Sequence, residues 1–164
     1  MGQNGNVRIL APMSEKDIEW QKEQWLSEWG GETMITKGKK HHIQDLDAFI
    51  AWVDDLRVGA ATYRLGINDC ELMSINTTVQ GIGIGSNLIS TVEQKVKQSG
   101  RNRIWLITSN DNLDALRFYQ RRGYRITAIN QNAIDEARKL KPTIPKVGYY
   151  DIPIHDEIEL EKIL

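Results

Sequence analysis

The sequence predicts one α/β domain, spanning 1–164, with a mixed β-sheet. Its 164 residues are the usual size of a single domain and are enough to bury a core without disulfides. Three strand-like runs follow one another over 47–79 and predict an antiparallel meander. Strand-helix-strand patterns come after them, and they predict parallel neighbours in the same sheet. The continuous apolar run 103–108 is typical of a strand buried on both faces.

The N-terminal third begins with a short strand expected at 7–11. Ser14 followed by Asp17 resembles a capping box and predicts a helix over about 15–29. The polar stretch 32–46 after this helix is expected to be irregular. Four apolar residues of the helix are expected to lie near one face: Ile18, Trp25, Leu26 and Trp29.

The rest of the chain alternates between strand and helix patterns, with turn residues between them. The last strand alternates apolar and acidic residues and could pair across a homodimer. The expected strands are 47–54, 57–65, 70–79, 103–108, 124–130 and 157–164, and the expected helices are 83–99, about 112–122 and 131–141.

Composition and charge favour a cytoplasmic protein. The formal net charge of −1 gives no general attraction to nucleic acid or to an anionic membrane, so neither is expected as a partner. The single cysteine, Cys70, excludes an intramolecular disulfide and fits a reducing compartment. The first ten residues lack the apolar run of a signal peptide, and no stretch approaches the ~20 apolar residues of a membrane span.

The strongest local motif is the segment 80–86, QGIGIGS, where a strand leads into a helix. Its glycines let a ligand approach the backbone closely, and the first N–H groups of a helix attract anions, so the segment predicts phosphate or pyrophosphate binding. A tight turn without a ligand is the alternative. A P-loop is excluded because no lysine follows Gly85, and a dinucleotide fingerprint is the weaker interpretation because Ser86 replaces its third glycine.

Two ordered motifs resemble the GNAT superfamily of N-acetyltransferases. Gln80-x-x-Gly83-x-Gly85 matches its coenzyme A loop, and Asn112-x-x-Ala115-x-x-Phe118-Tyr119-x-x-x-Gly123-Tyr124 matches its second signature. The region 110–164 is similar to bacterial GNAT proteins of unsettled substrate. The resemblance implies a mixed sheet of six to seven strands with helices on both faces. It also implies acetyl transfer from acetyl-CoA to a primary amine, on a small molecule or a peptide, without a metal.

The resemblance also implies which residues bind acetyl-CoA. The strand before the glycine loop is expected to diverge from the strand after the next helix, with the pantetheine arm in the opening. Asn112 is expected to touch this arm, and Tyr119 to lie near the thioester sulfur. The remaining coenzyme-binding residues are expected to be Met73, Ser74, Ile75, Gln80, Gly81, Ile82, Gly83, Ile84, Gly85 and Ser86.

Direct acyl transfer needs a base for the amine, an oxyanion site and an acid for the leaving thiolate. A phenol with a pKa of ~10 is protonated near neutrality, so Tyr119 is the candidate acid. Glu71 is the candidate base; side chains alternate along a strand, so Glu71, Met73 and Ile75 are expected to share one face. A solvated Glu71 is the alternative. His155, Asp156 and Glu157 are other candidate bases.

The identity of the acceptor is not readable from the sequence. Its specificity is expected to come from 20–45 and 131–156, and the acidic residues Glu23, Glu28 and Glu32 would suit a cationic acceptor. The adjacent His41 and His42 lack partners at metal-ligand spacing and are expected in a solvated loop. A GNAT fold that binds acetyl-CoA without transferring it, and a nucleotide-binding protein, are the alternative functions.

Overall fold

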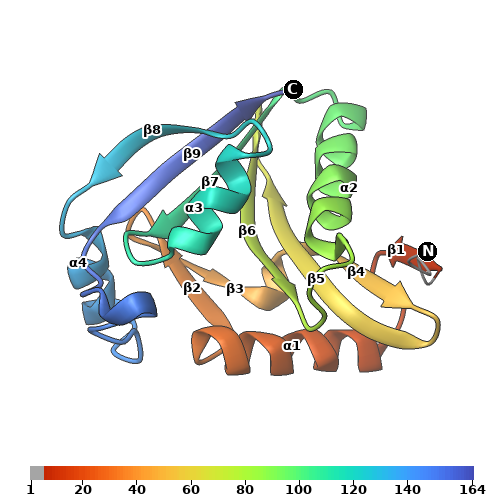
Figure 1. The fold of residues 1–164 in the computed structure, drawn as a ribbon, viewed down its shortest axis with the longest axis horizontal. Coiled ribbons are helices and arrows are strands. Elements are labelled where there is room, and N and C mark those ends of the chain that lie inside the picture. Colours follow the sequence, from red (N-terminus) through yellow and green to blue (C-terminus); the bar gives the residue numbers. More distant parts are fainter. Residues whose placement is uncertain (1–5) are drawn as a thin grey trace.

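The computed structural model describes residues 6–164 as a seven-stranded mixed sheet with helices on both faces, together with a separate two-stranded hairpin (Figure 1). The expected fold class is therefore confirmed. The expected lack of a signal peptide falls partly on residues 1–5, which lie outside the described residues. The elements are β1 (Val7–Leu10), α1 (Glu15–Trp29), β2 (Thr33–Thr36), β3 (Lys39–His42), β4 (Asp47–Val53), β5 (Leu56–Leu65), β6 (Cys70–Thr77), α2 (Ile84–Gln98), β7 (Arg103–Ser109), α3 (Leu113–Gln120), β8 (Arg125–Asn130), α4 (Ala133–Leu140) and β9 (Glu157–Ile163), with 3-10 turns at Ile43–Asp45 and Tyr149–Asp151.

The strand order in the sheet is β1-β4-β5-β6-β7-β9-β8. The meander from β4 to β6 is antiparallel, as predicted, and the β6–β7 pair is parallel because α2 carries the chain back between them. β9 lies between β7 and β8 and pairs with both. The expectation that this strand pairs across a homodimer is therefore wrong, since neither of its edges is free.

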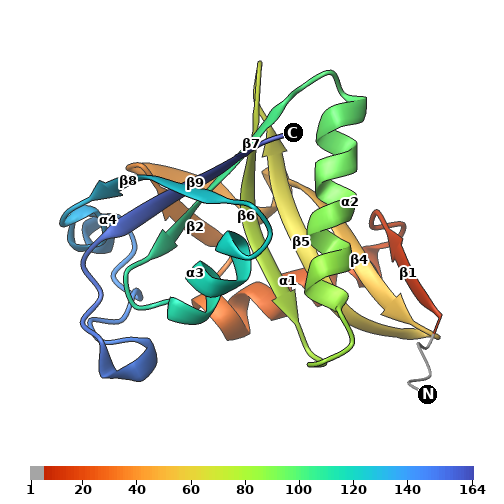
Figure 2. The same ribbon diagram turned by 45° about the horizontal axis from the view of Figure 1, so that its top comes forward.

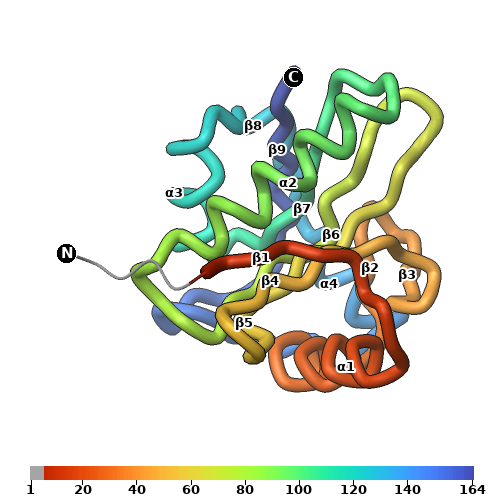
Figure 3. The backbone as a smooth tube through the Cα atoms, turned by 90° about the vertical axis from the view of Figure 1, so that its right-hand side faces the viewer, coloured from red at the N-terminus to blue at the C-terminus, as the bar shows by residue number. Residues whose placement is uncertain are grey.

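The helices cover the two faces of the sheet unequally. Figure 2 shows α2 and α3 in front of the sheet and α1 behind it, and Figure 3 shows α1 on the opposite side of β4 and β5 from α2. The main apolar core lies on the α2 side, where Leu88, Val92 and Val96 are fully buried against the strands. Among the described residues, no helix is long and apolar enough to cross a membrane.

The buried face of α1 differs from the predicted one. Its buried residues are Asp17, Gln21 and Trp25, whereas Leu26 is 63% exposed. Ser14 does cap the helix, because Asp17 N–H donates to its Oγ at 3.3 Å, but the Asp17 carboxylate accepts from Met13 N–H at 2.9 Å and from Arg57 Nε at 3.0 Å. This ion pair draws a polar side chain towards the sheet, and apolar periodicity alone does not register it.

The stretch 32–46, expected to be irregular, contains the hairpin of β2 and β3. Its two-residue turn is formed by Lys37 (φ 49°) and Gly38 (φ 74°), both in the left-handed region. Two-residue hairpin turns of this type need positive φ at both positions, and their usual sequence signal is Asn-Gly or Asp-Gly. The turn is not predictable from the sequence because lysine replaces the usual Asn or Asp at its first position. The strands are not predictable because a composition rich in Lys and His is typical of a loop.

Gly59 of β5 lets α2 lie close to the sheet, and Gly59→Ala should lower the free energy of unfolding by about 1–3 kcal/mol. A Cβ there would lie 2.8 Å from the Asn76 carbonyl oxygen and 3.0 Å from Ile84 Cγ2, at the start of α2. Chemical denaturation measures the loss. Gly31→Ala is the control, since no atom lies within 4 Å of its Cβ. An equal loss in both variants would contradict the packing argument.

Candidate active site

An opening in the sheet separates β6 from β7. The two strands pair only from Cys70↔Ile104 to Leu72↔Leu106, and Figures 1 and 2 show them diverging beyond this point. β6 nevertheless continues to Thr77. Its other edge pairs with β5, so the edge that faces β7 offers backbone groups to a ligand. Met73, Ser74 and Ile75, the predicted partners of the pantetheine arm, lie on this part of the strand.

A β-bulge at Met73 changes which side chains of β6 share a face. The register moves from Tyr63↔Leu72 to Thr62↔Ser74, so Met73 is the extra residue. Directly paired residues lie on the same face, and Thr62 Oγ1 contacts Ser74 Oγ at 2.5 Å. The expectation that Glu71, Met73 and Ile75 share a face is therefore wrong. The face that carries Glu71 continues through Ser74, because the extra residue shifts the alternation by one.

Glu71 is 2% exposed and lies in a buried polar network beneath the hairpin. Thr36 Oγ1 donates to Glu71 Oε2 at 2.8 Å and is 2.9 Å from His41 Nε2. Arg64 Nη2 lies 3.6 Å from the other carboxylate oxygen. The alternative of a solvated Glu71 is therefore wrong. Its neighbours hold it in a fixed position.

The protonation states within this network follow from its geometry. The single Thr36 hydroxyl proton goes to Glu71, so His41 Nε2 is the donor to Thr36. Burial is the main cause that lowers the pKa of His41, with Arg64 adding to it, so its 3.9 Å contact with Glu71 is not an ion pair at neutral pH. Burial raises the pKa of Glu71, while Thr36 and Arg64 oppose that rise. His41 is 5% exposed, so the predicted solvated loop is wrong for this residue, although His42 does point to the other side of β3.

Tyr119 lies on the opposite face of the sheet from Glu71. Its side chain belongs to the apolar core beneath α2 and α3, with its ring centroid 5.6 Å from that of Tyr124 and 5.2 Å from that of Phe118. Burial alone raises the pKa of the Tyr119 phenol, so the group keeps its proton at neutral pH. Asn112 caps α3, because its Oδ1 accepts from Ala115 N–H at 3.2 Å.

The glycine loop leads from β6 to the first turn of α2, as the motif predicts. Gly81 (φ 82°) and Gly83 (φ 75°, the N-cap) need glycine for their backbone conformation. Gly85 is small for another reason, since a Cβ there would lie 3.2 Å from the Phe118 ring. The first N–H groups of α2 point out of the helix beside Arg122, whose Nε donates to Ser86 Oγ at 3.1 Å. The positive helix end and this guanidinium form a setting that suits an anion. Gln80 and Ile82 are exposed on the same loop.

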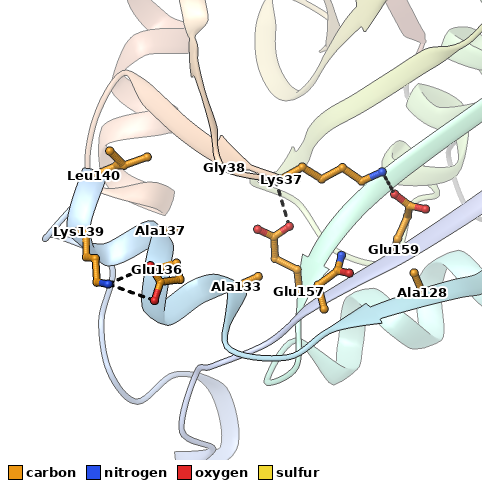
Figure 4. A pocket seen from close by; sticks show the side chains of 11 residues that line it. Lys37, Gly38, Ala128, Ala133, Glu136, Ala137, Lys139, Leu140, Glu157 and Glu159 are labelled. Carbon is orange, nitrogen blue, oxygen red and sulfur yellow. Dashed lines mark hydrogen bonds and ion pairs between the residues drawn. The ribbon is translucent and has the colours of Figure 1, made fainter.

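A second group of acidic residues lines a pocket of about 620 Å³ between the hairpin turn, β8, β9 and α4 (Figure 4). Glu157 is 1% exposed, and its Oε2 accepts from Lys37 N–H at 3.2 Å. Lys37 Nζ pairs with Glu159, and it also lies 4.6 Å from the centroid of the Trp105 ring. Burial raises the pKa of Glu157, although both the backbone N–H and the ammonium group of Lys37 oppose the rise.

The structure separates the other predicted acidic and basic candidates. His155 is exposed and its Nδ1 lies 2.9 Å from Asp135 Oδ2, and Asp156 Oδ1 accepts from Asn132 N–H at 2.9 Å. Of the three alternative bases, Glu157 alone lines the pocket. The acids suggested for a cationic acceptor are exposed and do not line it: Glu23, Glu28 and Glu32. Among residues 6–164, no group of three His, Cys, Asp or Glu could hold a metal ion.

Sequence reasoning missed Thr36, Lys37, His41 and Glu159. Three of them belong to the hairpin that the composition hides. Thr36 and His41 are diagonal neighbours across β2 and β3, which only the register reveals. The sequence signal for Glu159 is its alternation with the apolar residues of β9. This alternation predicts that Glu159 lies on the opposite face from those residues, but it does not predict that this face is buried.

Comparisons with known proteins agree on one family. A sequence model of the acetyltransferase (GNAT) family matches residues 17–124. The uncharacterised protein YdhI of Bacillus subtilis is 36% identical over 159 residues, which cover 96% of this chain and 99% of YdhI. A GNAT family acetyltransferase from Elizabethkingia anophelis, with acetyl-CoA bound, has a similar fold at a TM-score of 0.75 and 18% identity, covering 97% of this chain and 99% of the other. Arabidopsis thaliana Naa50, in complex with the bisubstrate analogue CoA-Ac-MVNAL, also has a similar fold, at a TM-score of 0.71 and 22% identity, covering 96% of this chain and 99% of the other.

Proposed function

The chain belongs to the acetyltransferase (GNAT) family, and we propose that it transfers the acetyl group of acetyl-CoA directly to a primary amine. One arrangement carries the proposal: where the pairing of β6 with β7 ends, the carboxyl group of Glu71 is buried on one face of the sheet, and the protonated phenol of Tyr119 belongs to the core on the other face. A thioester in the β6–β7 opening would meet a base and an acid from opposite sides. The acetyl-CoA and the bisubstrate analogue bound to proteins of similar fold support this assignment.

Acetyl-CoA would bind along the edge of β6 and the start of α2. The pantetheine arm would pair with backbone groups of Met73, Ser74 and Ile75, which face the opening. The pyrophosphate would lie over Gln80–Ser86, where positive-φ glycines and free helix N–H groups lower the cost of binding an anion. Asn112, which caps α3, would lie beside the arm.

The reaction would pass through a tetrahedral intermediate. A lysine-like amine has a pKa of ~10.4, so it must lose a proton before it attacks, and Glu71 would accept that proton through a water molecule. The new N–C bond would form as the oxyanion accepts from a backbone N–H near Ile75. The C–S bond would then break, the Tyr119 hydroxyl would donate its proton to the leaving thiolate, and the proton lost by the acetylated nitrogen would return through water to the Tyr119 oxygen.

Acetyl-CoA incubated with a panel of primary amines tests this proposal. We expect free thiol and acetylated amine to appear in equal amounts, measured by a thiol reagent and by mass spectrometry. The N,N-dimethyl form of an active amine is the matched control and should give no stable product. Calorimetric binding of coenzyme A without transfer to any amine would favour the alternative of a non-catalytic module. A preference for NAD or ATP over coenzyme A would contradict both.

A further inference from the structure

The pocket between the hairpin turn, β8, β9 and α4 lies on the same face of the sheet as Glu71. Glu71 pairs in register with Trp105 of β7, while Ile107 and Ser109 of the same strand pair with Glu159 and Glu157. Residues two apart on a strand share a face, so the three acids follow one face from β6 to β9. β7 is also one side of the opening. An acceptor that enters from this pocket would therefore approach from the side of the candidate base.

The charges in the pocket do not cancel. Lys37 supplies one positive charge and pairs with Glu159. Lys139 and Glu136 pair with each other at the exposed rim, 2.9 Å apart. Glu157 has no ion pair of its own among the described residues, because Lys37 donates only its backbone N–H to this carboxylate and its ammonium group, which pairs with Glu159, acts on Glu157 only from beyond ion-pair distance. A buried carboxylate without a positive partner is costly, and an ammonium group would remove that cost.

Two buried carboxylate oxygens of the pocket have no hydrogen-bond partner among the described residues: Glu159 Oε1, which pairs with the Lys37 ammonium group, and Glu157 Oε1, which has no ion pair there either. The Glu157 side chain is 1% exposed and lines the pocket, and Figure 4 shows its carboxyl group between the hairpin turn and β9. A carboxylate oxygen in this position can accept a charge-assisted hydrogen bond. The unsatisfied Glu157 Oε1 distinguishes the pocket from an ordinary group of surface acids.

The remaining walls of the pocket are mostly apolar and carry no further charge, with Asn130 as an additional polar residue. Ala128 of β8, Ala133, Ala137 and Leu140 of α4 leave room for methylene groups. We propose that the pocket binds the acceptor, and that the acceptor is a small aliphatic diamine whose second ammonium group pairs with Glu157. This rests on the proposed acetyl transfer: one amine would receive the acetyl group while the other stays charged in the pocket.

The test compares α,ω-diamines from propane to hexane with the monoamines of equal chain length. The wild-type chain should show a kcat/KM for its best diamine about 10- to 100-fold above that for the matching monoamine, the range expected of one charge-assisted hydrogen bond. Glu157→Gln keeps the shape and removes the charge. It should abolish this preference by raising KM for the diamine. Glu23→Gln, which removes one exposed charge on α1, is the control and should keep the preference.

A second measurement separates this inference from the proposed function. Calorimetry of the same diamine with wild-type, Glu157→Gln and Glu23→Gln chains, each saturated with coenzyme A, reports binding without turnover. Acetyl transfer to monoamines with no diamine preference, or a preference that survives Glu157→Gln, overturns the pocket assignment and leaves acetyl transfer standing. Diamine binding that weakens in Glu157→Gln alone, without transfer to any amine, supports the pocket as a diamine site and counts against the proposed reaction. Circular dichroism and unchanged coenzyme A affinity check that the variants fold.

Discussion

Acetyl transfer by a Tyr119→Phe variant is expected to be about 10²-fold slower than by the wild-type chain, at the low end of general acid catalysis. The low end applies because a thiolate with a pKa of ~8.5 leaves moderately well without a proton. The affinity for coenzyme A should not change, since the substitution removes only the hydroxyl group. Steady-state kcat, together with a calorimetric Kd for coenzyme A, measures the two quantities separately.

Tyr124→Phe is the matched control for this prediction. Tyr124 is a second buried tyrosine in the same core, and its hydroxyl reaches Glu93 at 3.5 Å. Its kcat should stay within a few-fold of the wild-type value. Both rings keep their edge-to-face packing after substitution, so loss of fold would not explain a selective effect at Tyr119. Equal kcat values for the two variants would contradict the role of Tyr119 as the acid.

Glu71→Gln should lower kcat/KM at neutral pH by about 10²- to 10³-fold, because an amide cannot accept the proton of the amine. In the wild-type chain only the ionised carboxylate accepts it. The rate should therefore rise with pH through the pKa of Glu71, which burial raises above the ordinary value of 4.5. In Glu71→Gln this rise should disappear, leaving the titration of the amine itself. A pH profile of kcat/KM is the measurement.

Thr36→Val provides the control for the pH profile. Its hydroxyl donates to Glu71 and lowers the pKa of that carboxyl, so the nearly isosteric valine should move the rise in activity to higher pH. Activity should return towards the wild-type value once the carboxyl is ionised again. A Thr36→Val profile that coincides with the wild-type profile would show that the titrating group is not Glu71.

The free energy of unfolding of Glu71→Gln, relative to the wild-type chain, should increase as the pH rises, although the substitution lowers activity. The folded chain binds the Glu71 proton more tightly than the unfolded chain, because burial raises its pKa. The stability linked to this carboxyl is complete below its ordinary pKa of 4.5 and is lost as pH rises towards the raised value. The free energy of unfolding of Glu71→Gln, relative to wild type, should thus be higher at about pH 8 than at about pH 4. Chemical denaturation at both pH values measures it, and a difference independent of pH would contradict the prediction.

Some parts of the candidate site are predictable from the sequence and others are not. The glycine loop and the Asn112–Tyr124 signature are local, because each lies on one turn and one helix, and their spacing survives folding unchanged. The position of Glu71 on the strand before the glycine loop predicts it as a candidate base. Its burial could not be foreseen, since the hairpin that covers it comes from a segment whose lysines and histidines are typical of a loop.

The sequence by itself determined the mixed α/β fold, the meander, the strand-helix-strand units and the resemblance to the acetyltransferase family, because these depend on periodicity and spacing along the chain. Only the tertiary structure decided which side chains meet. The bulge at Met73 shifts the alternation of β6, and the pairing of β9 with both neighbours removes its free edge. The sequence does not distinguish Glu157 from His155 and Asp156 as a candidate base. The tertiary structure does, because the hairpin turn and α4 line a pocket around Glu157. Contacts between residues about 120 positions apart, such as Lys37 with Glu157, leave no periodic trace in the sequence, because the sheet creates them by pairing distant strands.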